Sequence, residues 1–484
     1  MSIILTTIVT YKTKHSSSPN NKLPQGSFGW APFIGETFQF LYSNPEKFIH
    51  DRMNKYSSQV FKTSVFGKQT AVVCGPSGHK FLFYNKDVAA WRTPSMEKLF
   101  NNNKKAARDY DQSDAALKEW EKSQIALQLP SFLKPKAIMD YLPVMNSVIK
   151  DHFDAQWYPF FSNHDQQSVV IIKAFPLAKR YTLTLACKLF LGLDDPNRLV
   201  KLAREFDLVT EGLGVAAVKV PGMAFYRASK AVEAIRMQLT SIVKEKAIAM
   251  NMGMEMAQDM LGYMMGLRDG GDENLLRDGD VADKMMGLLV AGYSTVASAI
   301  TFLMKYIGMH SHVYDQVLRE QREIMNAKGG KESGTLGWED IQKMKYSWNV
   351  VQEVMRLVPP LQGNFREALS DLTFAGFTIP KGWKIYWSVS STNKNPEYFP
   401  DPERFDPSRY EGTGPPPYTF VPFGGGTRTC PGKEYARVAV LMFLHNVVRR
   451  FKWETVFPDE KIISQMMPTP ALGVPVRLHP HIVH

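Results

Sequence analysis

The long apolar stretch from Asp280 to His312 constrains the fold of this chain more than any other feature. It is nearly free of helix breakers, and it exceeds by far the helix length of about 10–14 residues that is usual in globular proteins. A helix that is apolar on most of its faces must be surrounded by protein. The stretch therefore predicts one central helix, buried inside a large and mainly helical protein.

Shorter patterns on either side of this stretch predict further helices and a smaller β part. Two β-like runs, VFKTSVF and QTAVVCG, are joined by Gly67 and Lys68, which predicts a hairpin. Strand-like runs also extend from FTIP to WKIYWSV, and Pro221 with Gly222 marks a turn. Other helices are expected at 45–56, over most of 114–320, at 338–357 and at 433–450. The expected fold class is mainly α with a minor β subdomain.

The composition and the N-terminus set the domain organisation that we expect. The chain has 484 residues, of which 44% are hydrophobic and 22% charged, so it can form a large core. Because it has no repeat and no Gly/Ser-rich linker, we expect a short apolar N-terminus with a polar linker at 1–22 and a single large domain at 23–484. The apolar run Ile3–Val9 is far shorter than a membrane span of about 20 residues. No other stretch is expected to span a membrane, so any membrane contact should be interfacial or weakly anchored.

The net charge of +11 results from 58 Lys and Arg against 47 Asp and Glu. A basic surface can attract nucleic acid, anionic lipid or an acidic protein. Since the basic residues are scattered and no nucleic-acid-binding motif is present, we expect no nucleic acid partner. An acidic redox partner, a membrane surface and a basic surface that merely faces water all remain open.

The chain has three cysteines: Cys74, Cys187 and Cys430. A count that is both small and odd argues against a disulfide framework. Cys74 and Cys187 stand in the apolar runs AVVCG and LTLACKLF, so each is expected to be a buried, inert thiol. Cys430 stands in a different setting, a glycine-rich loop that leads into the helix expected at 433–450.

The loop around Cys430 carries the chemistry of the chain. Glycines let backbone N–H groups approach a sulfur atom, and a helix N-terminus adds positive potential, so both favour a thiolate. A thiolate is a soft, electron-rich ligand for iron. Arg428 can pair with an anionic carboxylate through two parallel hydrogen bonds. The alternative is a structural cysteine in a glycine-rich turn. The residues of the loop that we assign to this site are Phe423, Gly424, Gly426, Arg428, Cys430 and Gly432.

This loop resembles the haem-binding signature Phe-x-x-Gly-x-Arg-x-Cys-x-Gly of the cytochrome P-450 superfamily, and it matches at every fixed position from Phe423 to Gly432. The resemblance implies the cytochrome P-450 fold and haem b, with Cys430 as the ligand of the haem iron. It also implies an oxidoreductase, a haem-thiolate monooxygenase that uses O2.

A second motif, Glu353-Val-Met-Arg356, places a Glu and an Arg on one helix face. Alone it carries little weight, because surface helices contain many such pairs. In the resembled family this pair and a later Arg lock together beneath the haem, which implies Arg404 as the third member. The three residues are expected to support the cysteine loop.

A third motif, Ala291-Gly-Tyr-Ser-Thr295, lies in the long central helix and resembles the oxygen-activation segment of the family. The resemblance implies that Gly292 opens room for O2 beside Ala291 and that Thr295 steers protons. The alternative is a packing face of small residues. Ser294 departs from the family, which usually has an acid there, so we expect Ser294→Asp to improve the coupling of NADPH use to product.

The resemblance implies a few further contacts to haem and substrate. Arg366 is expected to bind a haem propionate, with an ordinary surface Arg as the alternative. Ala126 stands where relatives usually carry a basic residue for the other propionate. Leu361, Gln362 and the loop from Met466 to Leu472 are expected to line the substrate pocket.

Three longer stretches are similar to plant microsomal members that oxidise triterpenes: WEDIQKMKYSWNVVQEVMRLVPPLQGNFREA, FTIPKGWKIYWSV and PYTFVPFGGGTRTCPGKEYARVAVLMFLHNVVRRFKWE. The similarity implies a bulky hydrophobic triterpenoid or sterol-like substrate and plant secondary metabolism. It also implies an NADPH-dependent flavin reductase as partner and the cytosolic face of the endoplasmic reticulum membrane. Reductase docking is expected at Lys433, Arg437, Arg449 and Arg450. The alternatives are a haem-thiolate isomerase or dehydratase that needs no reductase, and a non-catalytic haem-binding protein.

Overall fold

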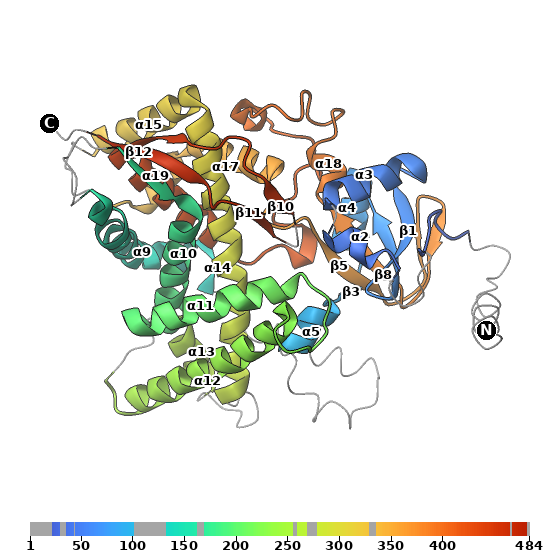
Figure 1. Cartoon of the computed structure of the whole chain (residues 1–484), viewed down its shortest axis with the longest axis horizontal. Coiled ribbons are helices and arrows are strands. Elements are labelled where there is room, and N and C mark those ends of the chain that lie inside the picture. Colours follow the sequence, from blue (N-terminus) through green and yellow to red (C-terminus); the bar gives the residue numbers. More distant parts are fainter. Residues whose placement is uncertain are drawn as a thin grey trace. The chain divides into compact units, whose positions relative to one another are not determined.

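In the computed structural model, the contacts within the chain divide it into two units (Figure 1). The first unit consists of Met1–Arg92 and Gly363–Thr392, and the second of Thr93–Gln362 and Asn393–His484. Each unit is described by itself below. The structure describes residues 22–29, 35–42, 44–100, 132–161, 169–254, 259–268, 278–328, 335–464 and 467–481.

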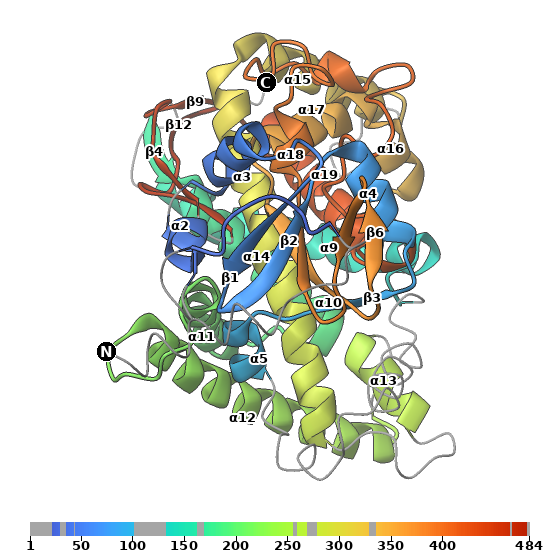
Figure 2. The same ribbon diagram turned by 90° about the vertical axis from the view of Figure 1, so that its right-hand side faces the viewer.

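The first unit contains the larger sheet, in the order β1-β2-β8-β5-β3. Its first two strands, β1 and β2, lie side by side (Figure 2). Its β1–β2 hairpin confirms the one predicted from the sequence. The turn, however, consists of Phe66 and Gly67, with φ of 55° and 69°, and not of Gly67 and Lys68, because Lys68 already pairs with Val65 as the first residue of β2. Strands β2 and β8 pair in parallel, and the other neighbours are antiparallel. The strands are β1 (Val60–Val65), β2 (Lys68–Val73), β3 (Val88–Ala90), β5 (Gly363–Ala368) and β8 (Lys384–Ser388), with a separate hairpin of β6 (Leu372–Phe374) and β7 (Phe377–Ile379).

Aromatic side chains form the core of the first unit. Phe40 and Phe48 from its helices meet Phe61, Phe365 and Tyr386 from the sheet, and edge-on ring contacts such as Phe40–Tyr386, at 5.1 Å between centroids, suit aromatic pairs. The helices are α2 (Thr37–Tyr42), α3 (Pro45–Lys55), which confirms the helix expected at 45–56, and α4 (Gly75–Tyr84); α18 (Ser390–Asn393) ends in the second unit.

The second unit is mainly helical. Its helices are α5 (Pro94–Phe100), α9 (Pro135–Gln156), α10 (Ala174–Leu191), α11 (Pro196–Leu213), α12 (Ala224–Asn251), α13 (Met260–Arg268), α14 (Asp278–Met309), α15 (Ser311–Asn326), α16 (Trp338–Lys343), α17 (Lys345–Leu357) and α19 (Lys433–Arg450), with short 3-10 turns η1 (Tyr158–Phe160), η2 (Pro407–Tyr410) and η3 (Gly426–Arg428). Its strands are β4 (Val170–Lys173), β9 (Phe451–Thr455) and β12 (Pro475–Pro480) in one sheet, and β10 (Ile462–Ser464) with β11 (Pro468–Pro470) in a hairpin.

Helix α14 is the long central helix that the sequence predicted. It runs through the middle of the second unit (Figure 1) and packs against α10, α12, α17 and α19. Most of its side chains are buried. Within the described residues it is the one helix long and apolar enough to span a membrane, which corrects the expectation that no stretch reaches that length. Because two thirds of its apolar window is buried in protein, α14 is a core helix.

The helix predicted at 338–357 is interrupted. It forms α16 and α17, which Met344 separates with φ of −75° and ψ of 59°, outside the helical region. Apolar periodicity continues through this point, so the sequence pattern does not reveal the break. The predicted turn at Pro221 and Gly222 is present, with Gly222 at φ of 85° between α11 and α12. The last helix, 433–450, is confirmed as α19.

A buried polar chain ties α15, α17 and α19 together. The ring of His445 pairs through Nδ1 with Oε1 of Gln321 at 2.7 Å, and the amide of Gln321 donates to Oγ of Ser347 at 2.8 Å. Burial lowers the pKa of His445 to about 3, and the charges of Arg449 and Arg450 act in the same direction. The ring of His445 is therefore neutral and donates through Nδ1–H. Through Gln321 it holds α17, which carries Glu353, against α19, which follows Cys430.

Candidate active site

The loop from Phe423 to Gly432 turns tightly and presents Cys430 in front of α19. Gly424 and Gly426 have φ of 68° and 64°, a backbone conformation that favours glycine. The amide of Cys430 donates to the carbonyl oxygen of Phe423 at 2.9 Å and closes the loop. Because the ring of Phe423 also packs against the core of the second unit, it anchors the loop and sets the position of the thiol.

Cys430 is the exposed one of the three free cysteines. Cys74 and Cys187 are buried, as predicted, and burial raises the pKa of both thiols, to about 12 for Cys187. Partial burial in the loop raises the pKa of the Cys430 thiol, and the hydrogen bond from the backbone N–H of Gly432 lowers it. The backbone N–H of the glycine loop therefore acts on the thiol as expected, and burial outweighs it. A bound metal cation would remove the proton, because coordination deprotonates a thiol outright.

One face of α14 is exposed although the helix runs through the core. Gly287 and Ala291 are exposed and Thr295 is half-exposed, at spacings of four residues, whereas Tyr293 and Ser294 are buried. Among the described residues, a Cβ added at Gly287 would meet nothing within 4 Å. The hydroxyl of Thr295 donates to the carbonyl oxygen of Ala291 at 2.7 Å. We call Gly287, Ala291 and Thr295 the open face of α14.

At Gly292, α14 packs against α10 and against α19, the helix that follows Cys430. An added Cβ would lie 3.4 Å from Cε2 of Phe190 on α10 and 3.5 Å from Cε1 of Tyr435 on α19. Tyr435 stands only five residues after Cys430. The expectation that Gly292 opens room for O2 is therefore corrected, because its Cβ position points into packed side chains.

The arrangement fits a haem group. Among the described residues, no group of three or more His, Cys, Asp or Glu could hold a metal ion, so a metal at Cys430 must bring its other ligands with it. Haem iron does so, since the porphyrin supplies its nitrogens and the protein an axial thiolate. The small side chains of the open face of α14 leave space for a flat group, and the Gly292–Tyr435 packing holds that helix next to the Cys430 helix.

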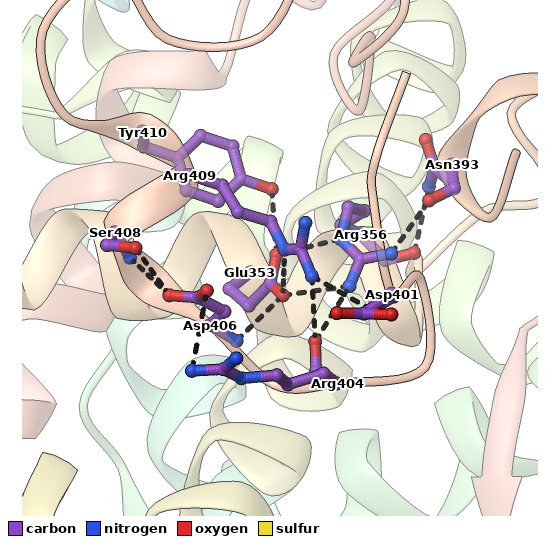
Figure 3. A network of polar contacts seen from close by, with 9 residues as sticks. All are labelled: Glu353, Arg356, Asn393, Asp401, Arg404, Asp406, Ser408, Arg409 and Tyr410. Carbon is purple, nitrogen blue, oxygen red and sulfur yellow. Dashed lines mark hydrogen bonds and ion pairs between the residues drawn. The ribbon is translucent and has the colours of Figure 1, made fainter. Parts of the chain in front are cut away.

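Glu353 and Arg356 form a fully buried ion pair on α17 (Figure 3). Nε and Nη2 of Arg356 donate to the two carboxylate oxygens of Glu353, each at 2.8 Å. Nη1 of Arg356 donates to the carbonyl oxygen of Asn393 at 2.8 Å, and the amide of Asn393 donates back to the carbonyl oxygen of Arg356 at 3.0 Å. Every charged atom of the pair thus has a partner, which a buried charge requires.

The third member of this network is Arg409, which corrects the assignment of Arg404. Nε of Arg409 donates to Oε1 of Glu353 at 3.2 Å, and the hydroxyl of Tyr410 donates to Oε2 at 3.3 Å. Arg404 contributes its carbonyl oxygen, which accepts from Arg356 at 3.3 Å, while its side chain is 69% exposed and lies 4.0 Å from Asp406. The stretch ERFDPSRY offers two arginines, and only the tertiary fold selects between them.

The other predicted contacts belong to different units. Arg366 belongs to the first unit, on β5, and it is buried with Nη1 donating to the carbonyl oxygen of Phe365 at 2.8 Å. It is therefore no ordinary surface Arg. Leu361 and Leu472 are exposed and Gln362 is half-buried, all in the second unit. Ala126 and Met466 lie outside the described residues.

The four basic residues expected at a docking face differ in their surroundings. Lys433 is exposed at the start of α19. Arg437 is 15% exposed and pairs with Glu434 at 3.1 Å. Arg449 donates to the ring of His445, and Arg450 donates to the side chain of Asn446 at 2.6 Å. The three arginines are therefore occupied in holding α19, and Lys433 is the one of the four that is free to meet a partner.

A thiol on a glycine-rich loop that leads directly into a helix suits a haem-thiolate oxidoreductase. The family model of cytochrome P450 matches residues 24–478, and the chain belongs to this family. It is a haem-thiolate monooxygenase with haem b as cofactor, and it works with O2, a hydrophobic substrate and a redox partner.

Relatives and solved structures agree over nearly the whole chain. A beta-amyrin 28-monooxygenase of Saponaria officinalis is 48% identical over 96% of this chain and 93% of its own length. A beta-amyrin 6-beta-monooxygenase of Solanum lycopersicum is 46% identical over 97% of this chain and 95% of its own. The solved structure of the retinoic acid-bound cyanobacterial CYP120A1 covers 95% of this chain and 100% of its own, with a TM-score of 0.80 at 29% identity. The predicted fold class is thereby confirmed.

Proposed function

We propose that this chain oxidises a pentacyclic triterpene of the beta-amyrin type, first of all at position 28. The observation that supports this most strongly is the 48% identity with beta-amyrin 28-monooxygenases of Saponaria officinalis and Vitis vinifera over nearly the full length of all three chains. The open face of α14 agrees with the proposal, because small side chains leave room for a rigid, bulky hydrocarbon near the reacting centre.

The residues of this chain have separate parts in the reaction. Bound haem supplies the oxygen chemistry and stores the electrons. Cys430 gives the iron an electron-rich sulfur ligand, held in place by Phe423 and the glycines of its loop. Arg428, in the second unit like Cys430, is proposed to bind a haem propionate. The hydroxyl oxygen of Thr295, whose proton is held by the carbonyl oxygen of Ala291, is placed to accept and pass on a proton at the open face of α14.

The proposed redox partner is an NADPH-dependent flavin reductase with an acidic docking surface. Lys433 is the exposed cation at the start of the Cys430 helix, where electrons must enter. We expect Lys433→Glu to raise the KM for reductase by about tenfold at low salt, since rim charges mainly steer association. Reductase titrations at low and high salt measure this. Lys452→Glu, on β9, is the matched exposed control with the same change of charge, and equal effects of both changes would contradict docking at Lys433.

The proposed location is the cytosolic face of the endoplasmic reticulum membrane. Val218, Val220 and Met223 are exposed between α11 and α12, next to the cation Lys219. Exposed apolar side chains beside a lysine suit the interface of an anionic lipid surface. These side chains support the proposal that the segment between α11 and α12 contacts the membrane, in addition to any contact made by the N-terminus.

The experiment that tests the function is product analysis with beta-amyrin, NADPH and a plant reductase. We expect a product oxidised at position 28, formed only when NADPH is present. Product formed without NADPH would favour the isomerase or dehydratase alternative. A protein that binds haem with a thiolate-type spectrum yet converts no triterpene would overturn the proposed substrate class.

A further inference from the structure

The turn that joins β11 to β12 contains a strained valine. Gly473 and Val474 have φ of 85° and 52°. Glycine adopts this region freely, whereas a β-branched residue there is a genuine outlier. Val474 is fully buried, so the strain is part of the folded core. A strained backbone persists only where its surroundings hold it, and such positions cluster at functional sites.

The carboxylate of Glu460 holds this turn from one side. Its Oε1 accepts from the backbone N–H of Leu472, and its Oε2 accepts from the backbone N–H of Val474 at 3.0 Å. Glu460 is only 7% exposed, and hydrogen bonds to a carboxylate are about twice as strong as those between neutral groups. Because the two bonds lie on either side of Gly473, they select one conformation of the most flexible residue of the turn.

Helix α10 holds the same turn from the other side. The amide of Ala174 donates to the carbonyl oxygen of Val474 at 3.0 Å, and the next amide, of Phe175, donates to that of Gly473 at 3.0 Å. Ala174 and Phe175 are the first two residues of α10, whose N–H groups need acceptors outside the helix. We call Glu460, Ala174 and Phe175 the clamp of the turn.

The clamp also touches α14, the helix that carries the open face. Nζ of Lys305, a buried residue of α14, donates to the carbonyl oxygen of Glu460 at 3.4 Å. Lys305 stands ten residues after Thr295, which is about 15 Å of helix. A rigid five-ring hydrocarbon spans a comparable length. The side chain of Leu472 is 47% exposed although its backbone is fixed, so it offers an apolar contact of defined position.

We propose that Glu460 is a positioning residue for the substrate: it fixes the turn so that Leu472 meets the apolar skeleton and sets which carbon faces the reacting centre. The inference rests on the proposed function and deepens it. Glu460 acts through Leu472, because both of its carboxylate oxygens are bonded to the turn. A substrate that is misplaced by about 1 Å can react about a hundredfold more slowly, so the position of one contact matters.

The first test needs no turnover and follows backbone amide exchange in D2O. Glu460→Gln turns an NH2 group toward one of the two N–H groups that the carboxylate accepted. We expect it to speed exchange in peptides that contain Leu472 and Val474 by about tenfold. Asp459→Asn, which removes an exposed carboxylate one residue earlier, is the matched control and should change nothing there. Unchanged exchange in Glu460→Gln would remove the contact on which the inference depends.

The second test measures ligand binding to the holoenzyme through the shift of the Soret band. We expect Glu460→Gln and Leu472→Ala each to raise the Kd for beta-amyrin about tenfold. The double variant should raise it no further than either change alone, because both act through one side chain. Imidazole, which is small enough to bind the iron without other contacts, should keep its Kd in all variants. Turnover should show a smaller fraction of product oxidised at position 28.

The outcomes separate the two proposals. If the parent protein binds imidazole but not beta-amyrin, the proposed substrate class fails, and an azole with a bulky apolar tail tests the same variants in its place. If amide exchange rises in Glu460→Gln while Kd and product position stay unchanged, Glu460 is purely structural and the inference is wrong. Additive effects in the double variant would contradict it as well. Leu472 is exposed, so Leu472→Ala should fold even where Glu460→Gln does not, and an unchanged Kd there would overturn the inference.

Discussion

Cys430→Ala is expected to abolish the thiolate-type carbon monoxide difference spectrum of the reduced protein and to bring product formation below detection. The other two cysteines, Cys74 and Cys187, are buried, so we expect neither thiol to take over as the sulfur ligand. Cys430 is exposed, and its replacement should change the free energy of unfolding by less than about 0.5 kcal/mol. Loss of the spectrum would therefore report lost ligation in a folded protein.

The matched control for this variant is Cys187→Ala. Cys187 is buried, so its replacement removes packing atoms and lowers stability, but it should leave the thiolate-type spectrum unchanged. Circular dichroism of both variants separates folding from ligation. A Cys430→Ala protein that keeps the thiolate-type band would rule out Cys430 as the ligand.

Arg356→Ala is expected to lower the free energy of unfolding by about 3–5 kcal/mol, because it leaves the fully buried Glu353 without its main partner. Urea unfolding of the purified protein measures the change, and haem content after purification should fall with it. The pair holds the segment that contains Asn393 and Arg404, so its loss disturbs the chain leading to the Cys430 loop.

Two arginines of the stretch ERFDPSRY, Arg404 and Arg409, provide the control. Arg409→Ala removes a donor to Glu353 and should destabilise clearly, by about 1.5–3 kcal/mol, the value of a hydrogen bond to a charged group. Arg404→Ala removes a side chain that is 69% exposed and should stay within about 0.5 kcal/mol of the parent. If Arg404→Ala destabilised as much as Arg409→Ala, the network drawn in Figure 3 would be wrong.

The sequence by itself determined the elements whose causes are local. The apolar run of α14 and the two-residue turn of the β1–β2 hairpin are each specified by residues close together in the chain. The Cys430 loop belongs with them, because its glycines, Phe423 and the following helix all lie within a short segment. Periodicity and turn chemistry therefore sufficed for these parts, whereas the cofactor followed from the resemblance of the loop to the haem-binding signature.

Only the tertiary structure decided which distant groups meet. It selected Arg409 over Arg404 as the partner of Glu353 and broke the helix at Met344. It placed Thr210 and Asp207 beside α14, although more than eighty residues separate them from Ser294 and Tyr293 in the chain. The partner of a polar side chain depends on how the helices pack. Many packing arrangements can bury the same apolar area, so the apolar pattern of the sequence does not select one of them. The local pattern of a sequence specifies that a helix is buried, whereas the contacts across its interfaces specify what its polar groups can do.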